Sequence, residues 1–330
     1  MRAWRSEGIM QLVDRRYAYG LLMGAALAAA VSGCAADQGT TGAAAAVAPD
    51  GARRTDRFDA VAATSEELVA GTLGGVMLSS RDGGRNWTRA TLAPPASIIG
   101  ATACPGDVPV ALDFYRKVWV QVDGQWAARP IPGKITPVAM TCDGAGRLWV
   151  VGSHTDIAMS GDHGKTWVST TLGEDAILST VHFFDPEHGI IGGEFGTVLN
   201  TVDGGKTWTK ASPLPADFYP YAMYFSNRDR GWVSGVAGAM FTTTDGGRTW
   251  VASDNPVKAS IYAFGGHAEK AYGVGADGKS ITLVGDNWAA RQVNNASAGE
   301  LSAVAVIPSG GAMVAGGSQL IQFGTRRNAD

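Results

Sequence analysis

The chain has 330 residues, of which 45% are hydrophobic and 17% are charged, and it contains 45 glycines but only 14 prolines. This composition is typical of a turn-rich globular protein. The formal net charge of −3 argues against a nucleic-acid partner, which requires a basic surface.

The N-terminus is predicted to be an export signal and not part of the fold. Arg15 and Arg16 precede the apolar run YGLLMGAALAAAV, which is too short for a comfortable membrane span. The run ends in VSGC at residues 31–34, which resembles the lipobox of bacterial lipoproteins. The resemblance implies that residues 1–33 are removed and that Cys34 is acylated. The alternative is an ordinary secretory signal next to an unrelated cysteine.

Residues 34–56 would then be the lipidated cysteine and a flexible tether rich in small residues. Ala35 follows Cys34, and in the lipoprotein resemblance a residue other than Asp at this position implies the outer membrane. We therefore expect an exported lipoprotein that faces the periplasm. Its acyl chains would hold the rest of the chain, residues 57–330, at the membrane as a single domain.

A pattern marked by tryptophan repeats along residues 57–330. Each repeat holds an alternating apolar strand, a strand that ends in glycine such as GIIGG, a third strand, and a strand that opens with tryptophan. The period is 38 to 42 residues, set by Trp87, Trp126, Trp167, Trp208, Trp250 and Trp288. Four strands in each repeat of this length predict the blade of a β-propeller.

We predict an all-β, seven-bladed β-propeller with four-stranded antiparallel blades, and six or eight blades are the alternatives. The expected blades span residues 58–92, 97–130, 136–172, 177–211, 219–253, 260–293 and 300–324. The last repeat has three strands and no tryptophan strand, and an open ring would leave unpaired edges. A segment just before Phe58 is therefore expected to supply the fourth strand of the last blade.

A short motif, Ser/Thr-x-Asp-x-Gly-x-Thr-Trp, lies between the third and fourth strands. Full copies are TVDGGKTW at 201–208 and TTDGGRTW at 243–250. An Asp carboxylate can accept backbone N–H bonds a few residues on, and glycine takes the positive φ of a tight turn. One carboxylate and one hydroxyl are too few for calcium, so we interpret the motif as a structural hairpin joint. The residues assigned to these joints are Asp82, Trp87, Asp162, Trp167, Asp203, Trp208, Asp245 and Trp250.

The motif resembles the Asp-box of the bacterial neuraminidase repeat, found in sialidases and in many non-enzymatic propellers. Two longer stretches, FFDPEHGIIGGEFGTVLNTVDGGKTW (183–208) and FSNRDRGWVSGVAGAMFTTTDGGRTW (225–250), are similar to the repeat of the photosystem II assembly and stability factor family. This resemblance implies a non-catalytic propeller. It also implies that the propeller binds another protein while a membrane or envelope complex is assembled or stabilised.

The enzymatic alternative is a sialidase-like propeller that binds or hydrolyses glycans. Sialidases resemble this chain in the Asp-box, but their Arg-Ile-Pro signature near the first strand is absent. The five histidines show no metal-ligand spacing. We therefore expect no catalytic residues, no metal and no cofactor. A protein is the expected partner, and a glycan is the alternative ligand.

The longest connection between repeats is SPLPADFYPY at 212–221. It belongs to the face opposite the Asp-box hairpins, together with the turns between second and third strands. Aromatic side chains on a stiff exposed loop suit a binding hot spot, and the alternative is that they pack within the fold. The candidate partner-binding residues on this face are Phe218, Tyr219, Tyr221, His154, Glu194 and Phe195.

Cys104 and Cys142 follow equivalent first strands, IIGATAC and PVAMTC, in adjacent repeats. They are expected at matching positions on neighbouring blades. An exported compartment is oxidising, so a disulfide is chemically allowed if the Cα atoms lie within about 7 Å. Two separate buried thiols are the alternative.

Overall fold

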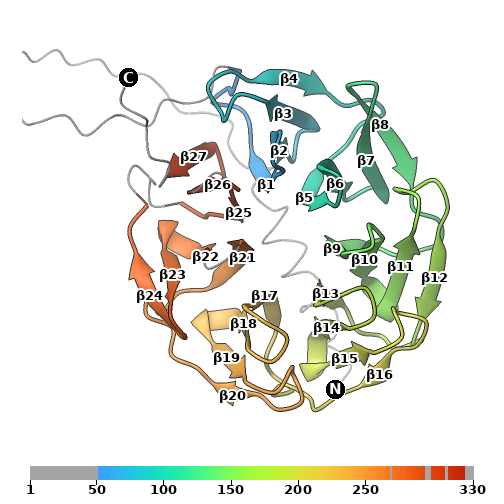
Figure 1. Ribbon diagram of the computed structural model, residues 1–330, viewed down its shortest axis with the longest axis vertical. Helices are drawn as coiled ribbons and strands as arrows, with labels where there is room; N and C mark the ends of the chain where they lie inside the picture. The colour runs from blue at the N-terminus through green and yellow to red at the C-terminus, as the bar shows by residue number, and fades with distance from the viewer. Residues whose placement is uncertain (1–50, 268–269, 294–298, 309–310, 324–330) are drawn as a thin grey trace, which may run out of the picture. The chain divides into compact units, whose positions relative to one another are not determined.

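The structure, a computed structural model, describes residues 51–267, 270–293, 299–308 and 311–323. Within these residues, six four-stranded antiparallel sheets and one three-stranded sheet follow one another around a ring (Figure 1). Each first strand contacts the first strand of the next sheet, and β1 contacts the last sheet, which closes the ring. The protein is therefore an all-β, seven-bladed β-propeller, and the predicted fold class is confirmed.

The strands of each blade follow in chain order from the inner to the outer edge of its sheet. Blade 1 contains β1 (Phe58–Ala63), β2 (Leu68–Thr72), β3 (Val76–Ser80) and β4 (Thr88–Thr91). Blade 2 contains β5 (Ile98–Cys104), β6 (Val108–Asp113), β7 (Lys117–Val122) and β8 (Gln125–Pro130). Blade 3 contains β9 (Pro137–Cys142), β10 (Leu148–Gly152), β11 (Asp156–Ser160) and β12 (Val168–Thr171).

Blade 4 contains β13 (Leu178–Phe183), β14 (Gly189–Gly193), β15 (Val198–Thr201) and β16 (Thr209–Lys210). Blade 5 contains β17 (Pro220–Phe225), β18 (Gly231–Gly235), β19 (Met240–Thr243) and β20 (Val251–Ala252). Blade 6 contains β21 (Ile261–His267), β22 (Lys270–Gly275), β23 (Ser280–Val284) and β24 (Asn287–Arg291). Blade 7 contains β25 (Ala303–Val306), β26 (Ala312–Gly316) and β27 (Gln319–Phe323). Short 3-10 turns join the second and third strands of blades 3 to 6: η2 (Ser153–Thr155), η3 (Glu194–Gly196), η4 (Val236–Gly238) and η5 (Ala276–Gly278).

The second strands form the most deeply buried layer of the blades. Every residue of β2, β10, β14, β18 and β26 is buried, which explains their nearly continuous apolar sequences. Five second strands end in glycine because the connection from the preceding blade crosses there. A Cβ would overlap a backbone carbonyl oxygen of that connection at Gly152, Gly193, Gly235, Gly275 and Gly316.

The junction of blades 7 and 1 differs from the sequence-based expectation. Blade 7 has three strands among the described residues, and residues 51–57 form no strand, so the predicted fourth strand is wrong for this segment. Instead, the Phe58 N–H donates to the Gly317 carbonyl at 2.7 Å, and the Phe58 side chain packs among apolar side chains of blade 7. An ion pair of 2.7 Å between Arg89 and Asp56 fastens the preceding segment to β4. Side-chain packing and single hydrogen bonds therefore close the ring here.

Cys34, the predicted signal peptide and most of the predicted tether lie outside the described residues. Over the ranges that the structure does describe, no helix has both the length and the apolar character needed to cross a membrane.

Candidate protein-binding face

The ring has two faces with different kinds of turn. The box face carries the turns between first and second strands and the Asp-box hairpins between third and fourth strands. The connection face carries η2 to η5 and the segments that lead from one blade to the next. This division follows from the antiparallel order, because successive turns alternate between the two ends of the strands.

The Asp-box carboxylates are engaged within their own hairpins. Asp203 Oδ1 accepts from the Thr207 N–H at 2.9 Å and from the Thr201 hydroxyl at 2.8 Å, while Oδ2 accepts from the Thr207 hydroxyl at 2.6 Å. These hydrogen bonds favour the charged form, and they lower the pKa of Asp203 to about 2, with the Thr207 hydroxyl as the largest cause. Similar turns are held by Asp82, Asp162 and Asp245.

The second glycine of each box packs against the preceding blade. A Cβ on Gly205 in blade 4 would overlap the Trp149 indole of blade 3. The same box supplies Trp208, whose ring lies edge-on to Trp149 with centroids 6.0 Å apart. Equivalent overlaps would occur from Gly84 onto Gln322, from Gly164 onto Val118 and from Gly247 onto Ile190. The boxes are therefore joints between blades as well as hairpin turns.

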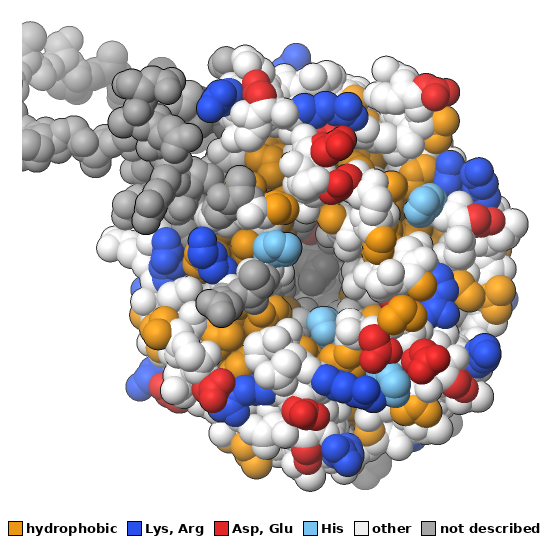
Figure 2. Space-filling model, viewed as in Figure 1, with side chains coloured by type: hydrophobic (Ala, Val, Ile, Leu, Met, Phe, Trp, Pro, Cys, Tyr) orange, Lys and Arg blue, Asp and Glu red, His pale blue; other side chains and the backbone are white. Residues whose placement is uncertain are grey.

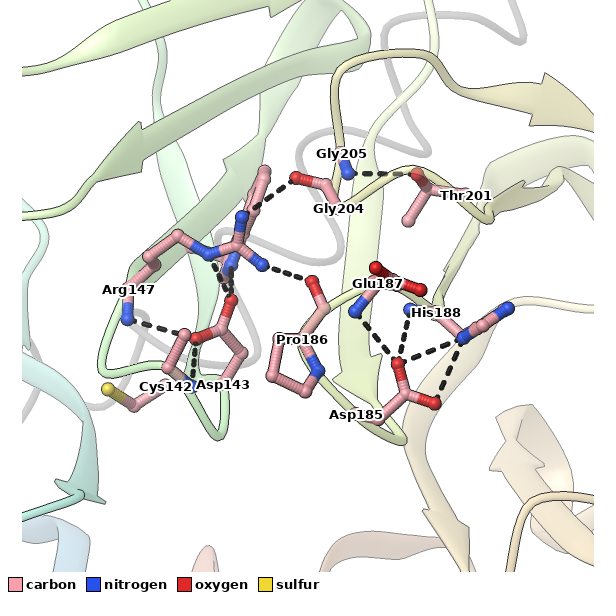
Figure 3. A network of polar contacts seen from close by, with 12 residues as sticks. Cys142, Asp143, Arg147, Asp185, Pro186, Glu187, His188, Thr201, Gly204 and Gly205 are labelled. Carbon is pink, nitrogen blue, oxygen red and sulfur yellow. Dashed lines mark hydrogen bonds and ion pairs between the residues drawn. The ribbon is translucent and has the colours of Figure 1, made fainter.

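Arg147 links blade 3 to blade 4 on the box face (Figure 3). Its Nε donates to Asp143 Oδ2 at 2.6 Å, and Nη1 donates to the Gly204 carbonyl at 3.2 Å. Nη2 donates to the Pro186 carbonyl in the turn between β13 and β14. Asp143 is buried and also accepts from the Trp149 indole N–H at 2.9 Å. The donors of Arg147 thus hold two neighbouring blades together.

A disulfide joins blades 2 and 3 on the same face. It connects Cys104 at the end of β5 to Cys142 at the end of β9, with the Cα atoms 5.2 Å apart. The two cysteines lie at matching positions of blades 2 and 3. Of the two alternatives that the sequence left open, the structure contains the bridge.

Polar contacts join other neighbouring blades near the same face. They are Ser65 Oγ with Asp107 Oδ2 at 2.6 Å, Arg228 with Asp185 at 3.9 Å, and Arg230 with Asp286 at 3.1 Å. In the view of Figure 2, Lys and Arg side chains are interspersed with Asp and Glu around the ring. Several charged side chains near the box face therefore form contacts between neighbouring blades.

Phe218, a predicted binding residue, is buried on the connection side. It is 4% exposed, and its ring meets Phe241 edge-on with centroids 4.9 Å apart. It occupies the space left by the missing Cβ of Gly235. The prediction of an exposed Phe218 is therefore wrong. Its long connection carries an aromatic plug inward, which is the packing alternative left open by the sequence.

Tyr219 and Tyr221 are half-buried and lie in a group of three tyrosines, termed here the tyrosine cluster. The ring centroids of Tyr219 and Tyr221 are 6.1 Å apart, and those of Tyr221 and Tyr262 are 5.3 Å apart. Tyr262 was not among the sequence-based candidates, although it is the second residue of β21 and Tyr221 is the second residue of β17. Comparing equivalent positions of the two repeats would have found it. The cluster lies at the connection-face ends of blades 5 and 6.

The middle residue of each 3-10 turn is left-handed and lies on the connection face. In η3 this residue is Phe195, with φ 57° and 62% of its surface exposed. In η2 it is the exposed His154, with φ 59°. A bulky residue with positive φ is strained, and an exposed phenylalanine gains nothing from burial in the free chain. Phe195 therefore presents an exposed aromatic ring on the connection face.

Glu194, another predicted binding residue, has a structural role instead. It is 9% exposed, and its carboxylate accepts from the Ile177 N–H at 2.8 Å. Burial raises the pKa of Glu194. The contact fastens the connection that leads into β13, so Glu194 holds this loop and does not face a partner.

His182 in β13 lies among aromatic rings on the inner edge of blade 4. It stacks on Phe225 with centroids 5.4 Å apart and meets Phe184 edge-on at 5.2 Å. Burial lowers the pKa of His182 to about 4, so the ring is neutral at neutral pH. Across the described part of the chain, no group of three or more His, Cys, Asp or Glu side chains is placed to hold a metal ion.

Comparison with known proteins identifies related propellers. Residues 165–304 match the family model described as photosynthesis system II assembly factor YCF48. No curated protein matches the chain. The solved YCF48 from Cyanidioschyzon merolae is 15% identical, with a TM-score of 0.65, and the match covers 83% of this chain and 97% of that one.

Two further solved structures share the fold. One is described as YCF48 bound to D1 peptide; it is 14% identical, with a TM-score of 0.64 and coverage of 82% of this chain and 92% of that one. The other is a catalytically inactive virginiamycin B lyase from Staphylococcus aureus with quinupristin, 14% identical, with a TM-score of 0.70 and coverage of 82% and 94%. At such identities a structural match establishes the fold alone.

The family match carries more information because it rests on sequence. It includes all of blades 4 to 6, and with them the two stretches, 183–208 and 225–250, that carry the resemblance in the sequence. Over residues 165–304, the chain is similar to the photosystem II assembly factor family, and the solved YCF48 structures share its β-propeller fold.

Proposed function

We propose that this chain is a non-catalytic, lipid-anchored propeller that binds a protein partner of a membrane or envelope complex on its connection face. The family match supports a role in assembly or stabilisation. A similar propeller, described as YCF48 bound to D1 peptide, supports a polypeptide as the ligand class. The sequence identity to that structure is 14%, so the comparison supports the class of ligand and does not identify the partner of this chain.

The observation that carries the proposal is the set of aromatic side chains on the connection face of blades 4 to 6. This set, termed the aromatic patch, comprises Phe195 and the tyrosine cluster. Phe195 stands exposed in η3, and Gly196 beside it packs on the connection that ends at Tyr219. Aromatic rings supply large contact area with few rotatable bonds, so ordering them on binding loses little entropy. Burial of an exposed phenylalanine ring stabilises a complex by about 1.5–3 kcal/mol.

The contrast between the two faces supports the same choice. On the box face, Arg147, Arg228 and the Cys104–Cys142 disulfide contact neighbouring blades. On the connection face, Phe195 and His154 project into solvent from turns that repeat around the ring. Turn residues on a rigid scaffold are a common place for recognition, because they can vary without disturbing the strands.

Membrane attachment through Cys34 would set where this binding happens. Residues 35–50 of the predicted tether are rich in small residues and, from their composition, would behave as a flexible chain with a root-mean-square span of about 22 Å. The tether would end where the ion pair between Asp56 and Arg89 fastens the chain to β4. Such a tether keeps the propeller close to the bilayer while both faces stay accessible. The expected location is the outer membrane, facing the periplasm.

A glycan-binding or glycan-hydrolysing propeller is the alternative function. The virginiamycin B lyase structure shares the fold of this chain. At 14% identity, this match does not support an enzymatic activity. The two functions differ in what the connection face retains, a polypeptide or a sugar. One capture experiment therefore separates them.

The experiment captures partners from membranes with the tagged full chain, Cys34 intact, after brief chemical crosslinking. The test variant is Phe195→Ser, and the matched control is Val168→Ser, since Val168 in β12 is equally exposed at 62%. We expect one stoichiometric protein with the wild type and the control, and a loss of about tenfold or more with Phe195→Ser. Absence of a protein partner, with retention on a glycan column, contradicts the proposal.

A further inference from the structure

A pocket lies on the connection face between blades 2 and 3, away from the aromatic patch. It is formed by the turn between β6 and β7 and by the connection that leads into β9, and it encloses ≈ 340 Å³. It is lined by Phe114, Tyr115, Arg116, Lys134, Ile135 and Thr136. Tyr115 is 57% exposed, one of the most exposed aromatic side chains of the described residues, and was not among the sequence-based candidates.

The pocket lining carries two positive charges and no acidic side chain. The nearby carboxylate of Asp113 is buried and already satisfied, because it accepts from the Trp119 indole at 2.9 Å and pairs with Lys117 Nζ at 2.8 Å. Among the described residues, no carboxylate forms an ion pair with Arg116 or Lys134. Two uncompensated cations therefore share one hollow.

The local backbone positions Arg116 for this arrangement. Its φ is 59°, a left-handed value that is strained for arginine, and its guanidinium donates to the Gly133 carbonyl. A guanidinium has five N–H donors, so the contact with Gly133 orients the group and leaves donors for a ligand. Lys134 follows Gly133 directly in the chain, so the same contact brings the two cations together.

Part of the pocket wall is apolar, beside the two cationic side chains, and this combination narrows the class of ligand. The Tyr115 and Phe114 rings meet edge-on at 5.7 Å, and Ile135 lies on the opposite segment. A planar guanidinium matches the two oxygens of a carboxylate, and the apolar part of the wall matches the methylene stem of an acidic side chain. Arg116, Lys134 and Thr136 are exposed, so the hollow admits a side chain from an extended segment.

We propose that this pocket binds an Asp or Glu side chain of the partner polypeptide. The inference rests on the proposed function, since it supplies a charged contact on the same face as the aromatic patch. The partner segment is therefore acidic at one point and apolar or aromatic at another. The two contacts together fix its direction across the ring, because only one orientation brings the acidic residue to blade 2.

The test uses the ¹⁵N-labelled full chain in detergent and the peptide acetyl-Gly-Glu-Gly-amide as probe. We expect saturable shifts of the Arg116, Lys134 and Thr136 amide signals, and about tenfold weaker binding of the isosteric acetyl-Gly-Gln-Gly-amide. Arg116→Gln/Lys134→Gln should lose at least tenfold in affinity for the Glu peptide. The control Lys165→Gln/Lys206→Gln removes two exposed box-face lysines and should bind as the wild type does.

Three results overturn the inference: equal shifts with the Gln peptide, no shifts with either peptide, or undiminished binding by Arg116→Gln/Lys134→Gln. A fourth result would assign the pocket to lipid instead. In this result the Cys34→Ser chain sediments with phosphatidylglycerol vesicles, the further change Arg116→Gln/Lys134→Gln abolishes the sedimentation, and the Glu peptide causes no shifts. Membrane capture separates this inference from the proposed function. If Phe195→Ser loses the captured protein but Arg116→Gln/Lys134→Gln retains it, the pocket inference alone is overturned. If the Glu peptide binds but no protein is captured from membranes, the proposed function is overturned.

Discussion

Gly205 lies so close to the indole of Trp149 that a single added carbon would overlap the ring. The two residues belong to different blades, Gly205 to the Asp-box hairpin of blade 4 and Trp149 to the second strand of blade 3. The same indole donates to Asp143, which in turn holds Arg147. One close contact thus connects the hairpin, the buried strand and the polar network of Figure 3.

This contact predicts an unequal effect of two similar substitutions. Gly205 and Gly83 have φ values of 78° and 74°, but a Cβ on Gly83 would meet nothing within 4 Å. Gly83→Ala should therefore lower the free energy of unfolding by about 1–2 kcal/mol, from backbone strain alone. Gly205→Ala should lower it by about 1–3 kcal/mol more, because Trp149 must move. Urea unfolding of both variants checks the difference, and equal losses would show that the joint tolerates repacking.

The corrected position of Phe218 gives a second prediction. Phe218→Ala removes a buried ring beside Phe241 and should lower the free energy of unfolding by about 3–5 kcal/mol. Phe195→Ser changes an exposed ring and should stay within about 0.5 kcal/mol of the wild type. Thermal unfolding of the two variants decides. A stable Phe218→Ala protein would restore the sequence-based interpretation of an exposed aromatic loop.

Much of the fold was predictable because its constraints are local. Blade boundaries follow from the tryptophan period and from glycines such as Gly193, which yield space to a crossing connection. The environment of Phe218 was not predictable, because it depends on a missing Cβ at Gly235 in another strand. The buried Asp–cation–Trp network has a sequence pattern that was not recognised. An aspartate is followed by a cationic residue four positions later and by a tryptophan two positions after that. The pattern occurs as Asp113, Lys117, Trp119 and as Asp143, Arg147, Trp149.

The candidate site was predictable only in part, for a physical reason. Turn chemistry indicates which loops reach the connection face, and it correctly brought Phe195 and Tyr221 to that face. Exposure of a side chain depends on how neighbouring blades pack, as Glu194 shows by turning inward to Ile177. The pocket at Tyr115 forms between a turn of blade 2 and the connection that leads into β9, and the sequence does not indicate that these two segments meet.

His182 predicts a pH dependence of stability in the acidic range. Its pKa falls from 6.5 to about 4 on burial, so the unfolded chain binds more protons between these values. The stabilisation is therefore complete above about pH 6.5 and is lost as the pH falls towards 4, amounting to about 1–3 kcal/mol. Chemical unfolding across this range should show a slope that His182→Gln reduces. His154→Gln serves as the control, since it removes an exposed histidine that does not stack on Phe225 or Phe184. An unchanged slope in His182→Gln would contradict the assignment.

The disulfide between blades 2 and 3 predicts a loss of stability on reduction. Cys104 and Cys142 are 38 residues apart, and a closed loop of this length stabilises a fold by about 3–4 kcal/mol in the chain-entropy description. Cys104→Ser/Cys142→Ser should lower the free energy of unfolding by that order. Dithiothreitol should bring the wild type to the level of the variant and leave the variant unchanged. A wild type insensitive to the reductant would mean that the thiols are separate in the mature protein.

The central claim is that the connection face, and not the box face, meets a protein partner. Site-specific photo-crosslinking in cells tests it most directly, with a benzophenone amino acid placed at Phe195 or, as the control, at Val202 on the box face, which is 70% exposed. The account predicts one discrete protein adduct from position 195 and none from position 202, with Cys34 intact. An adduct from position 202 alone, or no adduct from either position, would contradict it.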